Sequence, residues 1–291
     1  MQFSLELDYT PRGPQPGVPF TESSFRRKGA RFTLDTAEIG VVLVDLWNVG
    51  REGGPVGPTL GPELSTERGI SHARRKRQII EAVIAPTVTE LRSLGVPIFH
   101  GNHAEFLERY PQWIASTTEA EREARKAKPQ TPAPAPEGKK ETTAAWPPPE
   151  WVRAWRERHR DLVFNWEWSQ KQAKEVYPQI DIPAPVKPRG GDLLVYSREQ
   201  FHRLLTERRI RVLFYMGFET DECLQFTPYG MANMQDLGYL CVVVRDGTTT
   251  YESAETLEGL WRTKVEIERI EKRWGYSVAS QTLRHAVGSA R

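Results

Sequence analysis

The sequence has few cysteines and no long apolar run. Cys223 and Cys241 are its only cysteines, too few for a disulfide framework and typical of a protein from a reducing cytoplasm. No apolar run approaches the length needed to span a bilayer. The first residues, MQFSLELDYT, lack the basic start and apolar centre of a signal peptide. We therefore expect a cytoplasmic protein that does not enter a membrane.

The sequence also lacks an excess of charge of either sign, with 40 lysines and arginines against 38 aspartates and glutamates. This balance argues against a nucleic-acid-binding protein. Two basic runs, FRRKGAR (25–31) and RRKRQ (74–78), are interpreted as solvated surfaces of a helix or tail. With 38% apolar residues the chain can build a sizeable core. We expect a folded protein that binds a small-molecule substrate and does not bind nucleic acid.

Short apolar runs alternate along the chain with longer segments of helical period. The runs expected as strands are 40–46, 96–100, 192–196, 211–217, 239–244 and 276–280, and the segments expected as helices are about 70–94, 198–208, 223–237 and 252–274. Pro86 should kink or split the first helix. Continuously apolar strands separated by helices indicate a parallel sheet that is covered on both faces. The sequence therefore predicts an α/β fold: a doubly wound, mostly parallel Rossmann-like sheet with helices on both faces.

A Pro- and Trp-rich insertion, about residues 105–190, separates the second and third predicted strands. Helices are expected near 111–127 and 149–160, and the Pro-rich stretch 129–149 should be the least ordered part. The insertion holds five closely spaced tryptophans: Trp146, Trp151, Trp155, Trp166 and Trp168. They could attach it to the body or to another subunit, or form an aromatic lid over a pocket. We predict a single domain over 37–291, preceded by an N-terminal extension, 1–36.

Polar side chains follow three of the predicted strands. Asp45 ends the first strand, His100 and His103 follow the second, and Cys223 follows the fourth at the start of a predicted helix. Ligands of open α/β sheets gather at the carboxyl ends of the strands, so we expect these side chains to converge. A thiol at a helix N-terminus is favoured as thiolate, and Asp45 could accept its proton. The alternative for Cys223 is a small buried apolar residue, an interpretation that fits Cys241 well.

Two stretches carry a family resemblance. VVLVDLWN (41–48) and LFYMGFETDECLQFTPYGMANMQDLGYLCVVVRDGTT (213–249) resemble the isochorismatase-like cysteine hydrolases, relatives of nicotinamidase and carbamoylsarcosine amidohydrolase. The matching residues of the second stretch are Gly217, Thr220, Asp221, Cys223, Gly238, Tyr239 and Asp246. The resemblance covers roughly 37–103 and 190–280. It implies a Rossmann-like sheet and an Asp–Lys–Cys catalytic group, in which a thiolate attacks an amide-type carbon and forms a covalent intermediate.

By this resemblance, Asp45 is the base and Cys223 the nucleophile. A cis peptide is expected between Phe218 and Glu219, and the backbone N–H groups of Glu219 and Cys223 are expected to form the oxyanion hole. The family's lysine usually ends the third strand, but Tyr196 stands at that place in this sequence. The nearby cations that could replace it are Lys187, Arg189 and Arg198.

Several further residues are predicted to line a substrate pocket. They are Trp47, Asn48, His100, His103, Tyr196 and Phe218. Two histidines three residues apart, with no matching third ligand, are weak evidence for a metal, so we predict none. The Gly-rich stretch GREGGPVG (50–57) lacks the pattern of a phosphate loop or a dinucleotide fingerprint and is interpreted as a mobile pocket loop. No cofactor is expected.

These observations lead to two hypotheses. In the first, the protein is a cysteine-dependent hydrolase that cleaves a small C–N bonded substrate of the amide or carbamoyl type through a thioester-like intermediate. In the second, it is a catalytically silent member of the fold that binds a small ligand or a protein partner through the Trp-rich insertion. In both cases the apolar insertion leads us to expect a homo-oligomer.

Overall fold

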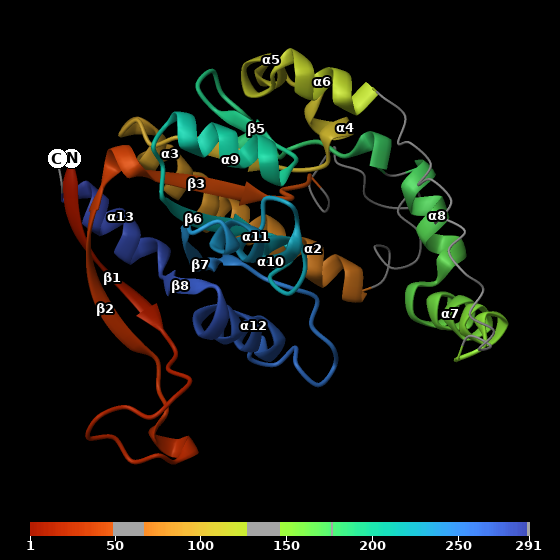
Figure 1. Cartoon of the computed structure of the whole chain (residues 1–291), viewed down its shortest axis with the longest axis horizontal. Coiled ribbons are helices and arrows are strands. Elements are labelled where there is room, and N and C mark those ends of the chain that lie inside the picture. Colours follow the sequence, from red (N-terminus) through yellow and green to blue (C-terminus); the bar gives the residue numbers. More distant parts are fainter. Residues whose placement is uncertain (49–66, 127–145, 176, 290–291) are drawn as a thin grey trace, which may run out of the picture.

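The computed structural model describes residues 1–48, 67–126, 146–175 and 177–289, and its centre is one eight-stranded sheet (Figure 1). The strands are β1 (Gln2–Tyr9), β2 (Lys28–Asp35), β3 (Ile39–Val44), β4 (Ile98–Gly101), β5 (Leu193–Val195), β6 (Val212–Gly217), β7 (Leu240–Thr248) and β8 (Gly275–Val278). Their order in the sheet is β2-β1-β8-β7-β6-β3-β4-β5. The strands from β3 to β8 pair in parallel, whereas β1 is antiparallel to both of its neighbours. The predicted mostly parallel sheet is confirmed.

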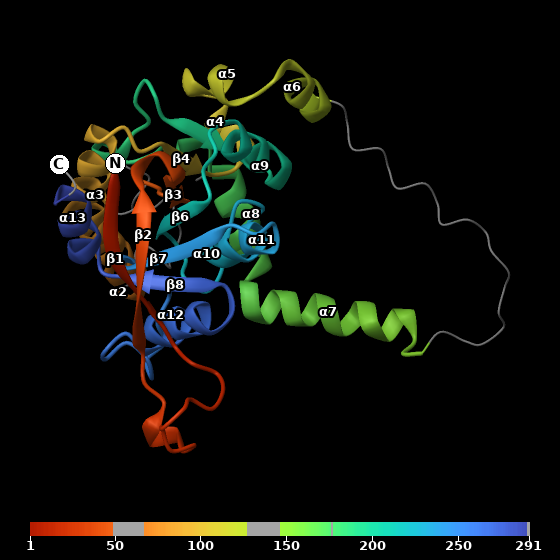
Figure 2. The ribbon, with the colours of Figure 1, turned by 60° about the vertical axis from the view of Figure 1, so that its left-hand side comes forward.

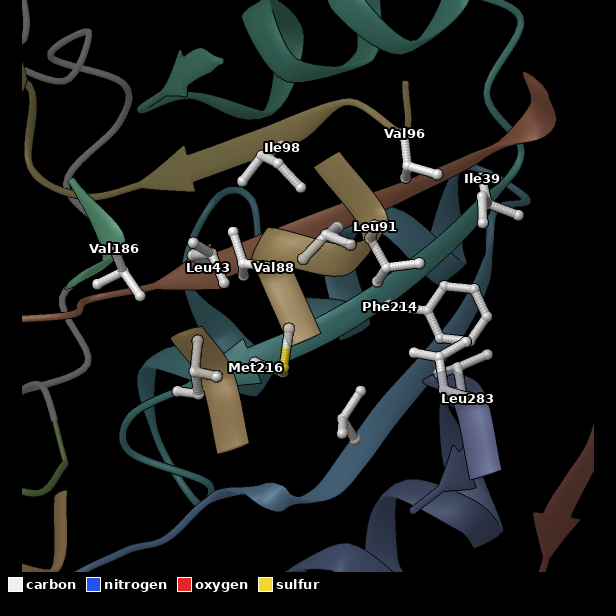
Figure 3. Close-up of a cluster of buried hydrophobic side chains, with 14 of the residues drawn as sticks. Ile39, Leu43, Val88, Leu91, Val96, Ile98, Val186, Phe214, Met216 and Leu283 are labelled. Atoms are coloured by element: carbon white, nitrogen blue, oxygen red, sulfur yellow. The ribbon is translucent and has the colours of Figure 1, made fainter. Parts of the chain in front are cut away.

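Helices cover both faces of this sheet, as predicted. One face carries α2 (Glu67–Ile79), the π-helical turn η4 (Ile80–Ile84), α3 (Ala85–Ser93) and α13 (Ser280–Gly288), and the other carries α9 (Arg198–Glu207), α10 (Cys223–Phe226), α11 (Met231–Asp236) and α12 (Trp261–Arg273). Successive side chains of a strand point to opposite faces. Thus Leu43 packs in one apolar cluster with Val88 and Met216 (Figure 3), while Val42 packs in the other cluster with Phe201.

The long helix before β4 is interrupted where Pro86 was expected to disturb it. The five-residue π-helical turn Ile80–Ile84 separates α2 from α3, and Pro86 lies in the first turn of α3. Proline has no N–H to donate and crowds the preceding turn, so the backbone widens just before it. Ile80 of the π-helical turn and Val88 of α3 are both buried against the same face of the sheet.

The N-terminal residues, expected as an extension of the domain, form a hairpin that continues the sheet (Figure 2). In β1 the side chains of Phe3, Leu5 and Leu7 are buried, and the residues between them are exposed. This alternation with a period of two is the signature of a strand with one buried face. The short 3-10 turns η1 (Glu22–Ser24) and η2 (Thr36–Glu38) follow β1 and β2, respectively.

The described part of the insertion is largely helical. Its elements are α4 (Ala104–Leu107), α5 (Gln112–Ser116), α6 (Glu119–Lys126), α7 (Pro149–Phe164) and α8 (Trp166–Glu175), followed by the 3-10 turns η5 (Tyr177–Gln179) and η6 (Ala184–Val186). Figures 1 and 2 show α7 standing away from the sheet. The predictions for most of 129–149 and for the loop 50–57 lie outside the described residues. Among the described residues no helix has the length and apolar character that crossing a bilayer requires.

Four of the five closely spaced tryptophans of the insertion are exposed, and the side chain of the fifth, Trp168, lies outside the described residues. The exposed fractions of Trp146, Trp151, Trp155 and Trp166 are 88%, 58%, 43% and 40%. Within the described residues these side chains neither attach the insertion to the body nor cover a pocket. Whether these side chains pack against another subunit stays a prediction.

Candidate active site

Asp45 follows β3 directly and lies at the carboxyl end of the sheet. Its backbone is in the left-handed region, with φ of 47°, and its N–H donates to the carbonyl of Gly101 over 3.0 Å. Only 6% of Asp45 is exposed. Its Oδ1 accepts the hydroxyl of buried Tyr229 over 3.1 Å, whereas Oδ2 is buried and has no nitrogen or oxygen donor among the described residues. Burial raises the pKa of the carboxyl group, because an ion is poorly solvated there.

Cys223, the first residue of α10, is half-buried and interacts directly with this carboxylate. Burial, followed by the charge and hydrogen bonding of Asp45, raises the pKa of the thiol well above its ordinary value. The backbone N–H of Glu219, which donates to the sulfur, acts to lower the pKa of the thiol. The side chains expected as base and nucleophile are thus neighbours, 178 positions apart in the chain.

The helix that begins at Cys223 is shorter than the sequence suggested. The expected segment 223–237 is divided into α10 and α11 around Pro228, which lacks an N–H and pushes Thr227 into an extended conformation. A single turn has a small dipole, so the helix stabilises a thiolate less than we expected. Stabilisation must come from neighbouring backbone and side-chain groups.

The loop between β6 and α10 supplies two backbone N–H groups near the sulfur. The peptide between Phe218 and Glu219 is cis, as expected. Gly217 has φ of 129°, and a Cβ there would lie 2.1 Å from the carbonyl oxygen of Val44, so only glycine fits. The N–H of Cys223 has no backbone acceptor within the described residues. This N–H and that of Glu219 are the two that the sequence resemblance predicts as oxyanion donors.

A cation reaches this centre from α2. The Nζ of Lys76 lies 2.9 Å from Oε1 of Glu219 and 5.4 Å from the ring centroid of Phe218, and its charge also lowers the pKa of Asp45. Burial disfavours the ammonium, but Glu219 and the other negative groups outweigh it, so the pKa of Lys76 lies above its ordinary value. The interpretation of RRKRQ as a solvated surface was wrong for this residue, which is 9% exposed. The missed signal is that Lys76 precedes buried Ile80 by four residues, on the same helix face.

The three cations proposed from the sequence lie elsewhere. Lys187 forms an ion pair with Asp181 over 2.6 Å, and Arg198 pairs with Asp236. The side chain of Arg189 is exposed, and its backbone N–H donates to an aspartate at the opposite end of β5. The structure therefore brings none of the three to Cys223.

Comparisons with known proteins bear on the fold. No family model and no curated protein matches the sequence. A cysteine hydrolase from Pseudomonas syringae pv. phaseolicola 1448A superposes with a TM-score of 0.51 at 13% identity, over 89% of this chain and 96% of that one. The chain has the isochorismatase-like fold. An isochorismatase from Pseudomonas putida KT2440 (12% identity, 86% and 91% covered, TM-score 0.44) and a nicotinamidase from Staphylococcus aureus (12%, 83% and 97%, 0.39) also match.

Some of the residues predicted to line the pocket lie near Asp45 and Cys223, and others do not. Phe218 is the first residue of the loop between β6 and α10 (residues 218–222, named the oxyanion loop for its expected role). His103 is close enough for its charge to lower the pKa of Asp45. The indole N–H of Trp47 donates over 3.4 Å to Oδ1 of Asn102, the residue that precedes His103. Asn48 makes two hydrogen bonds to the backbone of Asp181, at the end of the insertion.

Two of the predicted pocket residues, Tyr196 and His100, make their contacts with residues other than Asp45 and Cys223. The ring of Tyr196 packs against Trp113 of the insertion, with centroids 5.3 Å apart. His100 is buried, and its Nε2 lies 3.0 Å from Oδ2 of Asp192, which also pairs with Arg92 at the end of α3. His100 therefore belongs to a structural ion-pair network. The described residues contain no group of three His, Cys, Asp or Glu side chains that could hold a metal ion.

Proposed function

We propose that this protein is a cysteine-dependent hydrolase of a small C–N bonded substrate, of the amide or carbamoyl type. The observation that carries the proposal is the contact between the Cys223 thiol and the buried Asp45 carboxylate, beside the ammonium of Lys76 and two backbone N–H groups. A nucleophile, a base, a cation and oxyanion donors are the groups that acyl transfer to sulfur requires. The superposition on a structure described as a cysteine hydrolase supports the fold in which this chemistry would occur.

In the first step, the thiol transfers its proton to Asp45 as the sulfur attacks the carbonyl carbon. Burial makes the carboxylate a stronger base, and the transfer removes the charge of Asp45 that otherwise disfavours the thiolate. The pair carries one negative charge before and after the transfer, and Lys76 stabilises that charge in both arrangements. The carbonyl oxygen becomes the oxyanion and accepts hydrogen bonds from the N–H groups of Glu219 and Cys223.

In the second step, protonated Asp45 returns its proton to the leaving nitrogen while the C–N bond breaks, leaving a thioester-like acyl group on Cys223. A water molecule then attacks the acyl carbon, and Asp45 accepts a proton from it. The C–S bond breaks, the thiolate regains a proton, and the acid product leaves. Each proton passes through the single carboxylate, so the roles of Asp45 and Cys223 are inseparable.

The test is turnover on a panel of small amides, ureas and carbamates. Cys223→Ser and Asp45→Asn should each abolish turnover of whichever compound is cleaved, and Cys241→Ala, in the buried strand β7, should retain it. Mass spectrometry of a rapidly quenched reaction should show the acyl group on the peptide that contains Cys223. Undiminished turnover by either of the first two variants would place the chemistry elsewhere.

The second candidate function is binding without catalysis. The exposed tryptophans of the insertion favour it, because a monomer rarely leaves several large aromatic side chains in water. Alkylation of Cys223 by iodoacetamide at neutral pH discriminates between the two. Fast single-site reaction favours the hydrolase, and an inert thiol favours the binding protein.

A further inference from the structure

A chain of polar contacts leads from α2 to the oxyanion loop. His72, Arg75 and Lys76 lie three and four residues apart, on one side of the helix. Nη2 of Arg75 is 3.0 Å from Nδ1 of His72, Nε2 of His72 is 3.2 Å from Oε1 of Glu219, and the same oxygen accepts from Lys76. Only 3% of His72 is exposed. Three side chains of one helix therefore converge, directly or in relay, on the carboxylate of Glu219.

The direction of the hydrogen bonds assigns the protons on His72. A guanidinium only donates, so Nδ1 of His72 must accept and carry no hydrogen. The remaining proton is on Nε2, which donates to Glu219. In this arrangement the ring is neutral, with one defined tautomer.

The relay is anchored at its far end by the loop after β7. Arg75 donates from Nε to Oγ1 of Thr249 and from Nη2 to the carbonyl of Thr250, both over 2.9 Å. The ring of Tyr251 lies against the ring of His72, with centroids 3.9 Å apart and planes inclined by 32°. His72 is thus held in one orientation by groups from two loops at the carboxyl end of the sheet.

We propose that His72 is a positioning residue for the reaction at Cys223. It holds the Glu219 side chain so that the N–H of Glu219 stays directed at the sulfur and the carboxylate keeps Lys76 beside the centre. His72 contacts Glu219 and not the reacting atoms, so it acts through this residue. The part of the inference that concerns turnover rests on the proposed function, whereas the part that concerns the thiol does not.

Acid should disturb the relay. Burial, with the charges of Lys76 and Arg75, lowers the pKa of His72 further than Glu219 raises it. The groups that face the ring are Arg75 and Lys76 of α2, Glu219 of the oxyanion loop and Tyr251 of the loop after β7. A proton on Nδ1 would point at the guanidinium of Arg75 and break that contact. The ring is therefore neutral at pH 7 and is protonated only below the ordinary value of 6.5.

The experiment is the rate of iodoacetamide alkylation of Cys223, measured in full-length protein carrying Cys241→Ala. His72→Phe keeps a ring against Tyr251 but removes both nitrogens. It should slow alkylation about tenfold, the effect of one pKa unit on the thiolate fraction. His72→Gln can both accept and donate and should stay within about threefold of the parent, since it restores the relay. The matched control is His202→Phe, an exposed histidine of α9 that pairs with Tyr239.

The outcomes separate this inference from the proposed function. Alkylation of His72→Phe at the parent rate would overturn the positioning role, whatever the protein hydrolyses. If His72→Phe does not fold, the pH profiles of the parent and His72→Gln decide. The parent should lose additional reactivity below pH 6.5, and His72→Gln should not. Identical profiles would refute the inference. A parent that alkylates normally but cleaves no compound of the panel would defeat the proposed function alone.

Discussion

The pair formed by Lys76 and Glu219 should be strongly coupled in the stability of the protein. Their charged atoms are 2.9 Å apart, and only 11% and 15% of the two side chains are exposed. Removing one partner leaves the other charge buried without compensation, which destabilises proteins by about 3–5 kcal/mol. We therefore expect Lys76→Met and Glu219→Gln each to lower the free energy of unfolding by about this amount. The double variant should lose less than the sum, with a coupling of about 2–3 kcal/mol.

Urea unfolding of the parent, the two single variants and the double variant measures this coupling as a double-mutant cycle. The exposed pair Lys272 and Glu268 on α12 serves as the control. The exposed fractions of these two side chains are 39% for Lys272 and 45% for Glu268. A cycle on that pair should show a coupling below about 1 kcal/mol. Additive effects at Lys76 and Glu219, with a coupling no larger than that of the control, would refute the reasoning from burial.

The coupling should depend on pH in a defined direction. Burial acts to raise the pKa of Glu219, but Lys76 and His72 outweigh it, so the pKa lies below its ordinary value of 4.5. A lowered carboxyl pKa stabilises the fold above that ordinary value, and the contribution is lost as the pH falls through the folded pKa. The raised pKa of Lys76 stabilises fully below 10.5, and that contribution is lost as the pH rises through the folded value. The coupling should therefore be equal at pH 7 and pH 8 and should disappear in acid.

Three other predictions follow from single contacts. Burial would raise the pKa of Asp192, but hydrogen bonds from His100 and Arg92 hold it at about 2. Arg92→Met should therefore reduce the free energy of unfolding at pH 7, and it should reduce it less in acid, where the parent also loses the contribution of the carboxylate. Urea titrations at pH 7 and in acid measure this difference. Tyr229→Phe removes the donor to Oδ1 of Asp45. We expect turnover to fall about fivefold, the rate equivalent of about 1 kcal/mol for one hydrogen bond, and urea unfolding to show a loss of about 1–3 kcal/mol for the unpaired buried acceptor. Trp151→Ser should weaken self-association in sedimentation velocity, and a parent that is already monomeric would contradict the expected interface.

The sequence by itself determined the parallel sheet and the elements that bear Asp45 and Cys223. Their signals are local: apolar runs of strand length such as 211–217, helical periodicity between them, and residues placed at the ends of strands. The motif around Cys223 also indicated the oxyanion loop, because Gly217 and the residues after it are contiguous in the chain. The first strand of the N-terminal hairpin has a local signal too, the alternation of Phe3, Leu5 and Leu7 with exposed residues, although we expected only an extension there.

Only the tertiary structure decided which cation and which histidine pair with Glu219. Lys76 and His72 lie in a run of basic residues whose composition is that of a solvated surface, and 143 positions separate Lys76 from Glu219. Their burial depends on how α2 docks on the sheet, a long-range packing outcome; the four-residue spacing of Lys76 from Ile80 indicates only that the two side chains share one helix face. Conversely, His100 stands at the expected end of its strand, but its side chain turns to Asp192, because a buried imidazole takes the nearest carboxylate that can satisfy it.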